Sequence, residues 1–462
     1  MKLHLPSVRS VPWRGLPVLI VALVAGAGLS HADIVYADCG AASPTPPHYS
    51  TVQAALAALP NPVAPDNAQN VVYITGTCAE SVLVSGFVNL TIYAQTAGAT
   101  LTPGNIPGVG PYALMIEKSD KINVNTIYQP VLTFDGTTMP YSGPALVYVY
   151  ESTRVTFANC IFQNNTGGEG LRIDNSRDVF VTVSTLQNNA TSGLTVNGPS
   201  TVDFGNWNGP PYAATTVQNN GAANTGAAGI AVFGGATLML APGANVTGNA
   251  YDGVSVGANS YLIACCESTP ASASGPGPGV VQITGNGGNG INATGSSLLY
   301  LYAAMISGNK SSGISLDHSS ATLWDDTVEN NGIAGQPTQS NGILANYASS
   351  VGVMKSSVTG NLGPGVQAMG GSALMFCCDG VTISGNTGDG VLLQMNSNAA
   401  FWGSSTITGN TPADLVCTSG AVAVSAKGVD PGLGKIQCSG YTVLGPGGNP
   451  NKPPKPPKPP KH

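Results

Sequence analysis

Charged side chains are scarce in this chain and make up only 8% of its 462 residues. Arginine and histidine are especially rare beyond Ala32, where they occur only at Arg154, Arg172, Arg177, His48, His318 and His462. Between Asp33 and Asn449 there are 22 acidic and 9 basic residues. Nucleic-acid binding depends on Lys and Arg that meet phosphates, so we expect no nucleic-acid partner. The same acidity argues against tight binding of polyanionic glycans, unless a cation bridges the two.

Long apolar runs are missing as well, except near the N-terminus. Three basic residues precede the apolar run Leu16 to Leu29, and Ser30-His31-Ala32 has the small-x-small form of a cleavage site. This order predicts a signal peptide at residues 1–32 and a secreted mature chain, whether extracellular, periplasmic or at the cell surface. The alternative is a retained anchor, but the run is short for a span of about 20 residues. We therefore expect no membrane span in the mature chain.

What the chain does have is a repeat, in which an Asn, a short Gly-containing turn and an apolar strand follow one another. Ten copies of the repeat are marked by Asn165, Asn189, Asn220, Asn249, Asn286, Asn309, Asn331, Asn361, Asn386 and Asn410. The steps between these Asn residues range from 22 to 37 residues. A period of this length is typical of a solenoid, in which each coil packs only on its neighbours.

Alternation of apolar and polar residues predicts inward positions in the strand after each Asn. The first of them holds Leu171, Leu194, Ile230, Val254, Ile291, Ile314, Ile343, Val366 and Val391. Another apolar position lies three residues before each Asn, so we predict two or three short parallel strands per coil. Asn suits the turn because it tolerates a left-handed backbone, and stacked amides can bond one another. N-glycosylation at Asn189 and Asn245, which fit the acceptor rule, is the alternative.

The repeat region has a predicted cap at each end. Within residues 33–60, Ser50 and Gln53 fit a capping box, and the apolar residues that follow share one helical face. We therefore predict a short capping helix in this segment, a β-helix at 61–412 and a C-terminal cap at 413–449.

Other segments fall outside the repeat. Residues 450–462 are rich in Pro and Lys and predict a disordered polyproline-II tail, either a plain solvated end or a cationic contact for an anionic envelope surface. The longer steps between Asn residues mark insertions at 205–214, 220–229, 268–279 and 333–340. Loops on one side of a solenoid often carry binding residues, and flexible decoration is the alternative.

Nine cysteines are compatible with disulfides in an exported protein, although spacing alone does not fix their pairing. Four flank the first and last strand regions and predict two end staples, Cys39 with Cys78 and Cys417 with Cys438. Four more form adjacent pairs about four coils apart, oxidised or free: Cys265 with Cys266 and Cys377 with Cys378. Cys160 is left as one buried thiol.

The segments Tyr49-Ser-Thr-Val-Gln-Ala-Ala-Leu and Val72-Tyr-Ile-Thr-Gly-Thr-Cys-Ala-Glu80, followed by the repeat, carry a family resemblance. They resemble the start of many secreted members of the pectate-lyase-like superfamily, over roughly residues 45–412. The resemblance implies an all-β fold, a single-stranded right-handed parallel β-helix with a short N-terminal capping helix. It implies little about activity, because this fold hosts lyases, hydrolases, esterases, epimerases and adhesins.

Sequence strings of the family's enzymes are missing. Neither the Gly-His-Gly and Arg-x-Lys of polygalacturonase-like hydrolases nor the Asp-Pro-His-Asp of alginate-epimerase-like members occurs. We see no match to the strand Asp pair and Arg of pectin-methylesterase-like members. Calcium-binding Gly-rich nonapeptides are absent too, and we interpret Asp252-Gly253 and Asp389-Gly390 as turns. We therefore expect no metal and no cofactor.

One candidate site combines aromatic rings with an ion pair. In the alignment of coils, Tyr148 lies beside Arg172 and Tyr150 beside Asp174, all facing outward. Such a group could grip a sugar by ring stacking and by bidentate hydrogen bonds, which makes these four residues candidates for substrate binding. The alternative is a cross-strand ladder with a surface ion pair worth about 0–1 kcal/mol.

A second candidate site comprises Asp317, His318, Asp325, Asp326 and Lys355. Carboxylates, a His and a Lys could support acid–base work on a glycan, so these five are candidate catalytic residues. Asp325 and Asp326 point to opposite sides if both lie on a strand, in which case one of them serves a turn. The alternative is a structural ion pair beside a solvated His.

The scarcity of ionisable groups favours a secreted or surface-associated β-helix protein that is non-catalytic and binds a glycan or has a structural role. The alternative is an enzyme, a polysaccharide lyase or glycoside hydrolase that acts on an extracellular glycan. In either case the expected partner is an extracellular polysaccharide or a cell-envelope component, and we expect a monomer.

Overall fold

The computed structural model describes residues 33–42, 44–59, 69–104, 110–137, 145–206, 213–221, 225–265, 280–335, 340–426, 429 and 431–444. These residues all belong to one compact unit, Ala32–His462. The predicted signal peptide at 1–32, the insertion at 268–279 and the tail at 450–462 lie outside the described residues. Within the described ranges, no helix is long and apolar enough to cross a membrane.

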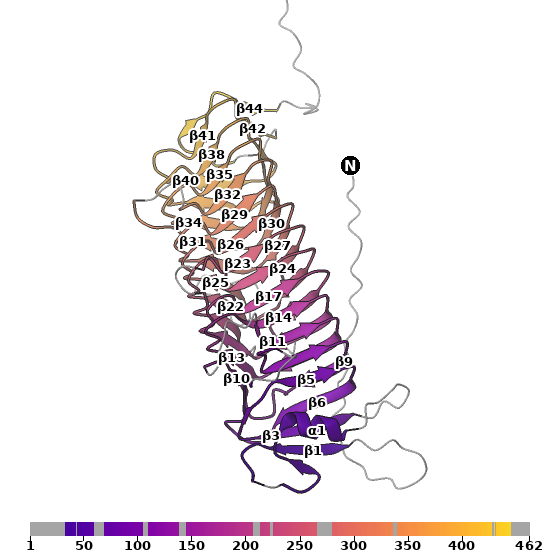
Figure 1. Cartoon of the computed structure of the whole chain (residues 1–462). Coiled ribbons are helices and arrows are strands. Elements are labelled where there is room, and N and C mark those ends of the chain that lie inside the picture. Colours follow the sequence, from indigo (N-terminus) through magenta and orange to yellow (C-terminus); the bar gives the residue numbers. More distant parts are fainter. Residues whose placement is uncertain are drawn as a thin grey trace, which may run out of the picture. The chain divides into compact units, whose positions relative to one another are not determined.

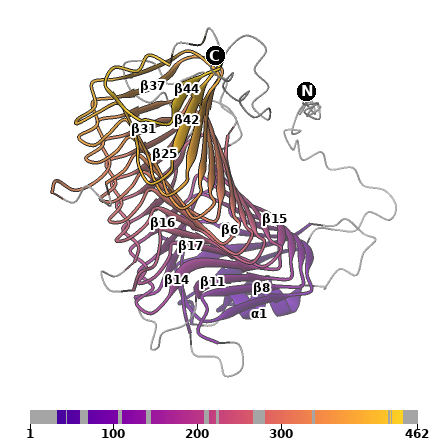
Figure 2. The ribbon, with the colours of Figure 1, turned by 90° about the horizontal axis from the view of Figure 1, so that it is seen from above.

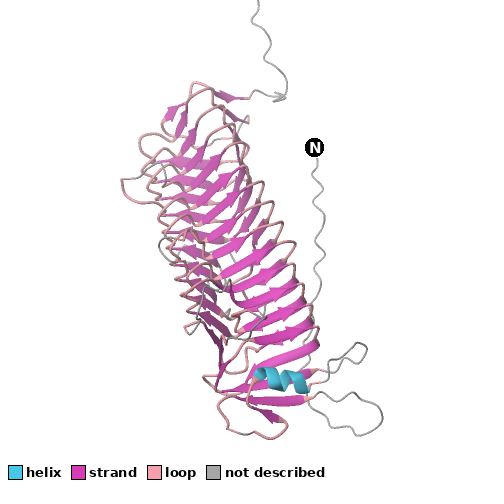
Figure 3. Ribbon diagram, viewed as in Figure 1, coloured by secondary structure: helices cyan, strands magenta, loops and turns pink. Residues whose placement is uncertain are grey.

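Three sheets run along the stack, and each coil contributes a strand to them (Figure 1, Figure 3). Sheet A has 17 strands: β1 (Ile34–Asp38), β2 (His48–Tyr49), β3 (Asn70–Thr75), β6 (Val88–Ala94), β9 (Asp120–Val124), β12 (Thr153–Ala158), β15 (Arg177–Thr182), β18 (Thr201–Phe204), β21 (Thr237–Leu240), β24 (Tyr261–Ala264), β27 (Leu298–Tyr302), β30 (Ser320–Trp324), β33 (Ser350–Met354), β36 (Ala373–Cys377), β39 (Asn398–Phe401), β42 (Val422–Ser425) and β44 (Tyr441–Val443).

Sheet B has 13 strands: β4 (Thr77–Ala79), β7 (Thr100–Thr102), β10 (Leu132–Asp135), β13 (Cys160–Gln163), β16 (Thr185–Gln187), β19 (Thr215–Gln218), β22 (Ala244–Thr247), β25 (Val281–Thr284), β28 (Ala304–Ser307), β31 (Thr327–Glu329), β34 (Ser357–Thr359), β37 (Val381–Ser384) and β40 (Ser405–Thr408). Sheet C has 14 strands: β5 (Val82–Ser85), β8 (Leu114–Glu117), β11 (Ala145–Tyr150), β14 (Glu169–Asp174), β17 (Leu194–Asn197), β20 (Ile230–Val232), β23 (Val254–Val256), β26 (Ile291–Thr294), β29 (Ile314–Asp317), β32 (Ile343–Asn346), β35 (Val366–Ala368), β38 (Val391–Leu393), β41 (Leu415–Cys417) and β43 (Ile436–Gln437).

A coil runs from sheet C to sheet A, then to sheet B, and returns to sheet C one coil further along. Successive strands of a sheet pair in parallel, as β11 does with β14 and β12 with β15. The predicted inward positions are confirmed, because the side chains of the first-position series from Leu171 to Val391 are fully buried. Aromatic rings stack between coils in the same core, Phe134 on Phe162 at 5.1 Å and Phe376 on Phe401 at 5.0 Å. The structure thus confirms the predicted parallel β-helix.

The repeat Asn residues form a buried column along the axis. From Asn189 onward, each Oδ1 accepts from the previous Asn of the column, as Asn309 does from the backbone N–H and the Nδ2 of Asn286 at 3.0 and 2.9 Å. The predicted amide ladder is therefore present, and Asn189, one of the two potential glycosylation sites, is buried in it.

The predicted left-handed backbone at these Asn residues is wrong. Positive φ values occur one residue earlier, for example at Asn164 (60°) and Gly285 (64°). The ladder requires each repeat Asn to point its amide into the stack, so the residue before it makes the sharp turn.

A column of serines, which the sequence analysis missed, occupies the corner between sheets C and A. The hydroxyl oxygen of most of these serines accepts from the backbone N–H of the serine one coil earlier, as Ser176 does from Ser152 at 3.1 Å and Ser372 does from Ser349 at 3.2 Å. Buried N–H groups at a corner have no strand partner, and these hydroxyls supply their acceptors.

Helix α1 (Val52–Ala58) covers the first coils (Figure 3). Its N-cap is Thr51, whose hydroxyl accepts from the Ala54 N–H at 3.1 Å, and not Ser50 as predicted. The predicted apolar face is confirmed, because Val52, Ala55, Leu56 and Leu59 are buried.

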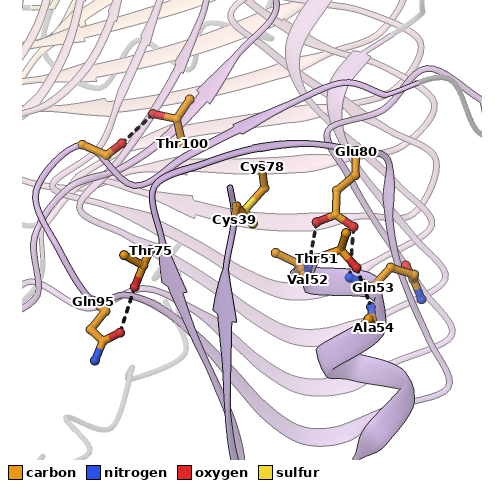
Figure 4. Close-up of a disulfide and its surroundings, with 11 residues drawn as sticks. Cys39, Thr51, Val52, Gln53, Ala54, Thr75, Cys78, Glu80, Gln95 and Thr100 are labelled. Carbon is orange, nitrogen blue, oxygen red and sulfur yellow. Dashed lines mark hydrogen bonds between the residues drawn. A yellow bond between two sulfur atoms is a disulfide. The ribbon is translucent and has the colours of Figure 1, made fainter. Parts of the chain in front are cut away.

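Glu80 explains why the predicted capping box does not form. Its carboxylate accepts from the backbone N–H groups of Val52 at 2.6 Å and Gln53 at 3.1 Å (Figure 4). Glu80, in the loop after β4, thus takes the Gln53 N–H that the Ser50 hydroxyl would accept in a capping box. The Oε1 of Gln53 accepts instead from the Leu83 N–H at 2.8 Å.

Both predicted end staples are present, with Cα–Cα distances of 5.1 Å for Cys39–Cys78 and 4.5 Å for Cys417–Cys438 (Figure 4 shows the first). Cys160 is a buried free thiol, as predicted. Cys265 is in a disulfide, whereas Cys266 lies outside the described residues. Cys377 and Cys378 are free thiols.

We predicted that the β-helix ends at residue 412 and that a cap follows. In the structure the strand ladders continue past this residue. Strands β41 to β44 still pair in parallel with their predecessors. The Asn column, however, ends in an acid: Asp414 Oδ1 accepts from the backbone N–H and the Nδ2 of Asn410 at 3.1 and 2.9 Å.

Candidate functional site

The first candidate site lies on the outward face of sheet C. Pairing of β11 with β14 puts Tyr148 opposite Arg172 and Tyr150 opposite Asp174, in the predicted register. Figure 2 shows β11, β14 and β17 next to one another on this side of the stack. Parallel strands are about 4.8 Å apart, so side chains in register on neighbouring coils are in contact range.

Arg172 is the central residue of this site. Its Nε donates to Asp174 Oδ2 at 2.9 Å, and its Nη1 lies 3.7 Å from Glu169 Oε2. The hydroxyl of Tyr148 donates to the same Asp174 oxygen at 3.0 Å. One guanidinium is therefore held between two carboxyl groups, and a phenol fixes one of them.

Glu169 is a site residue that the sequence analysis missed. Its Oε1 accepts from the hydroxyl of Thr195 at 2.9 Å, and its backbone carbonyl accepts from Asn165 Nδ2 at 2.7 Å. Asn165, the first repeat Asn, thus fixes the backbone at the start of β14. A signal was available: in later coils the equivalent residues Asp252 and Asn289 accept from the backbone of the next coil. A Glu in this column is too long for that role and reaches the outer face.

A pocket of about 420 Å³ opens beside Arg172. Residues of β14 and β17 line it, together with residues 226–228 of the predicted insertion at 220–229. Neutral polar groups line it, among them Ser192, Thr195 and Asn197, together with the ring of Phe233, which is 39% exposed. The pocket therefore offers hydrogen-bonding groups, one aromatic surface and one ion-pair cluster.

Burial shapes the electrostatics of the Arg172 cluster, of which Glu169 and Arg172 line the pocket. It raises the pKa of Glu169, an effect that Arg172 and Thr195 partly offset. Burial, followed by the adjacent Asp174 carboxylate, also raises the pKa of Tyr148, so its phenol stays protonated and remains a donor. Glu169 Oε2 and Asp174 Oδ1 are buried without a hydrogen-bond partner among the described residues. Perturbed groups in a cavity are typical of binding or catalytic sites.

The other aromatic residues extend the site along sheet C. The ring of Tyr148 lies 5.4 Å from that of Tyr112 and 5.9 Å from that of Tyr150. Arg154 does not take part, because its guanidinium binds Asp120 at the corner between sheets C and A.

The second candidate site is divided between two corners of the coil. Asp317 and His318 lie where sheet C meets sheet A, and His318 stacks on Tyr347 at 5.7 Å while it contacts Asp317. Asp325 and Lys355 lie where sheet A meets sheet B, and Lys355 Nζ sits 5.2 Å from the centre of the Trp324 ring. The structure does not bring these four residues together.

Asp326 differs from the others because it is buried in the core. Its two oxygens accept from the backbone N–H groups of Ala304 and Trp324, both at 2.7 Å. Burial raises its pKa to about 8. Asp326 thus serves the corner between sheets A and B and cannot reach a ligand on the surface.

Among the described residues, one cluster has three potential metal-ligating side chains close together, namely Cys39, Cys78 and Glu80. The two cysteines are joined in a disulfide, and the carboxylate of Glu80 caps α1. This cluster therefore lacks the thiolates that a metal ion would need.

Comparison with known proteins gives a family. The family described as "right handed beta helix region" matches residues 90–268 and 280–428. The chain belongs to this family. The match and the three parallel sheets confirm the resemblance to pectate-lyase-like proteins. No curated protein sequence matches the chain.

Solved structures with the same fold are distant. A mannuronan C-5 epimerase A-module of Azotobacter vinelandii is 12% identical and has a TM-score of 0.40. The match covers 77% of this β-helix chain and 91% of the epimerase module. Pectate lyase Pel9A is 15% identical, with a TM-score of 0.29 over 90% and 79%. PfbA, a surface adhesin of Streptococcus pneumoniae, is 10% identical, with a TM-score of 0.30 over 76% and 84%. At these identities and scores the neighbours carry no argument about activity.

Proposed function

We propose that this β-helix protein is secreted or surface-associated and binds an extracellular glycan, without catalysis, in the pocket beside Arg172. The observation that carries the proposal is the Arg172 cluster, in which a guanidinium between Glu169 and Asp174 adjoins a pocket of about 420 Å³. Secretion rests on the predicted signal peptide, and the two end disulfides are compatible with an oxidising compartment.

Charge indicates the class of glycan. The one guanidinium of the site is already shared between two carboxyl groups, and the chain outside its termini is acidic. A polyuronate would therefore meet net repulsion in the pocket. A neutral, hydroxyl-rich chain would find an acceptor in the Glu169 carboxyl group, donors and acceptors in Thr195 and Asn197, and a stacking surface in Phe233.

The test is retention of the full-length protein on a panel of insoluble neutral and acidic polysaccharides. Arg172→Ala and Phe233→Ala are expected to weaken binding of a neutral glycan about 10-fold or more, because each removes a direct contact worth roughly 1.5–3 kcal/mol or an exposed ring. Arg154→Ala is the matched control, since it removes an arginine that is bound to Asp120 outside the pocket. Circular dichroism confirms that each variant is folded.

Two results would count against the proposal. Retention on polyuronates in preference to neutral glycans would contradict the charge argument. Unchanged retention of both pocket variants would contradict the site.

A catalytic role in the same pocket is the second candidate, and one observation favours it: the raised pKa of Glu169, which is the property of a general acid. Release of reducing or unsaturated ends from any glycan of the panel, abolished by Glu169→Gln, would replace the binding function by a lyase or hydrolase function.

A further inference from the structure

Two adjacent thiols lie together at a corner between sheets A and B. Cys377 is the last residue of β36, and Cys378 follows it. Their Sγ atoms are 2.6 Å apart. Cys378 is exposed and Cys377 is half-buried, whereas the free thiol of Cys160 is buried. Of the free thiols in the described ranges, only this pair is within reach of a solute.

The turn that carries these thiols is two residues longer than the matching turns of the two preceding coils. Met354 pairs with Cys377 and Ser357 with Thr382, so two residues separate the paired positions in the preceding coil and four separate them here. Residues 378–380 all have positive φ values, 69°, 50° and 82°. The two extra residues therefore give this corner a backbone conformation that differs from the corners of the two preceding coils.

The next coil holds that backbone in place. The Ser404 N–H donates to Asp379 Oδ1 at 2.6 Å, and the Gly380 N–H donates to the carbonyl of Ser404 at 3.0 Å. Gly403 packs so closely that a Cβ at this position would lie 2.6 Å from the backbone nitrogens of Cys378 and Asp379. The two sulfur atoms are thus presented on a fixed turn.

We propose that Cys377 and Cys378 form a thiol–disulfide exchange site, which a small-molecule disulfide oxidises to a vicinal disulfide and a small thiol reduces again. The proposal is independent of the glycan pocket, which lies on a different sheet.

The exposed thiol is the attacking group. Burial, followed by the S–H contact with Cys378, raises the pKa of Cys377 to about 12, so Cys377 stays protonated. The Cys378 thiolate, having lost its proton to solvent, attacks one sulfur of the disulfide RSSR and releases RS⁻. Cys377 Sγ then attacks Cys378 Sγ, the Cys378–SR bond breaks, and the Cys377 proton goes to the second RS⁻. The net result is that two protein thiols are oxidised to one disulfide and RSSR is reduced to two RSH.

Geometry makes this bond easier to reduce than the end staples. Neighbouring Cα atoms are about 3.8 Å apart across a trans peptide bond, which is below the usual range of about 4.4–6.8 Å in disulfides. The staples, at 5.1 and 4.5 Å, lie inside that range. Strained, exposed disulfides are the labile ones, so a reductant can reopen the vicinal bond and leave the staples intact.

The experiment uses the native full-length protein with reduced and oxidised glutathione as probes. After exposure to reduced glutathione, alkylation and peptide mass mapping are expected to find Cys377 and Cys378 labelled and the four staple cysteines unlabelled. After oxidised glutathione, both labels are expected to disappear, with a mass lower by two hydrogens and no glutathione attached. Mapping by peptide separates this pair from Cys265.

Two variants test the order of attack. Cys377→Ser is expected to trap one glutathione on Cys378, and Cys378→Ser is expected to react at least about 10-fold more slowly, because the remaining thiol stays protonated. Cys160→Ser is the control and leaves the reaction unchanged. The proposal is overturned if both thiols remain alkylatable after oxidised glutathione, if wild-type protein stops at a glutathione adduct, or if reopening the pair also reduces Cys39–Cys78.

Discussion

Removal of one side chain from the middle of the Asn column tests how much this column stabilises the coils. Asn309 is fully buried. Its Oδ1 accepts from the backbone N–H and the Nδ2 of Asn286, and its Nδ2 donates to Asn331 Oδ1 at 2.9 Å and to the Ile283 carbonyl at 3.1 Å. The substitution Asn309→Ala removes all four bonds at once.

The magnitude follows from which groups lose their partners. The Nδ2 of Asn286 keeps the Val246 carbonyl as an acceptor, at 3.2 Å, but the acceptor of the Asn286 N–H is Asn309 Oδ1 itself. A buried donor without an acceptor costs about 1–3 kcal/mol, and each lost bond contributes about 0.5–1.5 kcal/mol. The free energy of unfolding is therefore expected to fall by roughly 3–5 kcal/mol.

The assay is guanidinium unfolding of the full-length protein, followed by circular dichroism. Hydrogen exchange at the Asn286 amide adds a local readout, because a solenoid can open in separate segments. The control is Asn398→Ala, which removes an exposed Asn at the start of β39 and is expected to change stability by less than about 0.5 kcal/mol. If Asn309→Ala were no more destabilising than this control, the column would be a by-product of the stacking and not a source of stability.

Three further predictions concern other corners of the coil. Because the folded-state pKa of Asp326 is raised to about 8, its contribution to stability is complete below about pH 4 and is lost as the pH rises through about 8. The free energy of unfolding of the wild-type protein, measured by denaturation, should therefore fall by on the order of 3 kcal/mol between about pH 5 and pH 9. The Asp326→Ser variant should show no such fall. Asp414→Asn should lower the free energy of unfolding by about 1–3 kcal/mol at neutral pH, because the new amide nitrogen then faces a backbone or side-chain N–H. Burial raises the pKa of Asp414, but the hydrogen bonds from Lys435 and Asn410 outweigh it and lower the pKa below its usual value. The difference in stability between this variant and wild type should therefore shrink only as the pH falls below about 4. Gly403→Ala should speed alkylation of Cys378, because the added Cβ loosens the turn that carries this thiol. Gly352→Ala is the control: its Cβ would meet only the Cε atoms of Met354 and Met375, at 3.4 and 3.6 Å, so the alkylation rate should not change.

The inward positions and the Asn column could be predicted because both follow from patterns that repeat along the sequence. Side chains of a strand alternate with period two, and the repeat brings each Asn back to the same place in the coil. The register of Tyr148 with Arg172 follows from the same alignment, so half of the candidate site could be found without coordinates. The serine column was missed because Ser also occurs at many other positions of this chain, so its recurrence at one corner does not stand out from the composition.

Glu169 and the pocket depend on information that the repeat does not contain. The residue lies in a column that other coils use for backbone contacts, and only its greater length turns it toward Thr195. Residues 226–228 of the insertion at 220–229 line the pocket, and the repeat pattern does not place them beside Arg172. Sequence alone left this insertion open as binding loop or decoration.

The separation of Asp325 from Asp326 has a more general cause. Within a strand, side chains alternate between inward and outward, so their faces can be predicted from the sequence. At a corner, a residue with positive φ turns the chain, and the alternation does not continue across it. Asp325, with a φ of 57°, is such a residue, and Asp326 then begins the side of sheet B with its carboxyl group inward. His318 (50°) and Lys355 (50°) also have positive φ values and lie at corners. A patch assembled by alignment from residues at such corners is therefore prone to mix separate corners. Candidates within strands, such as Arg172 and Asp174, do not have this problem, which is why only the first site remained intact.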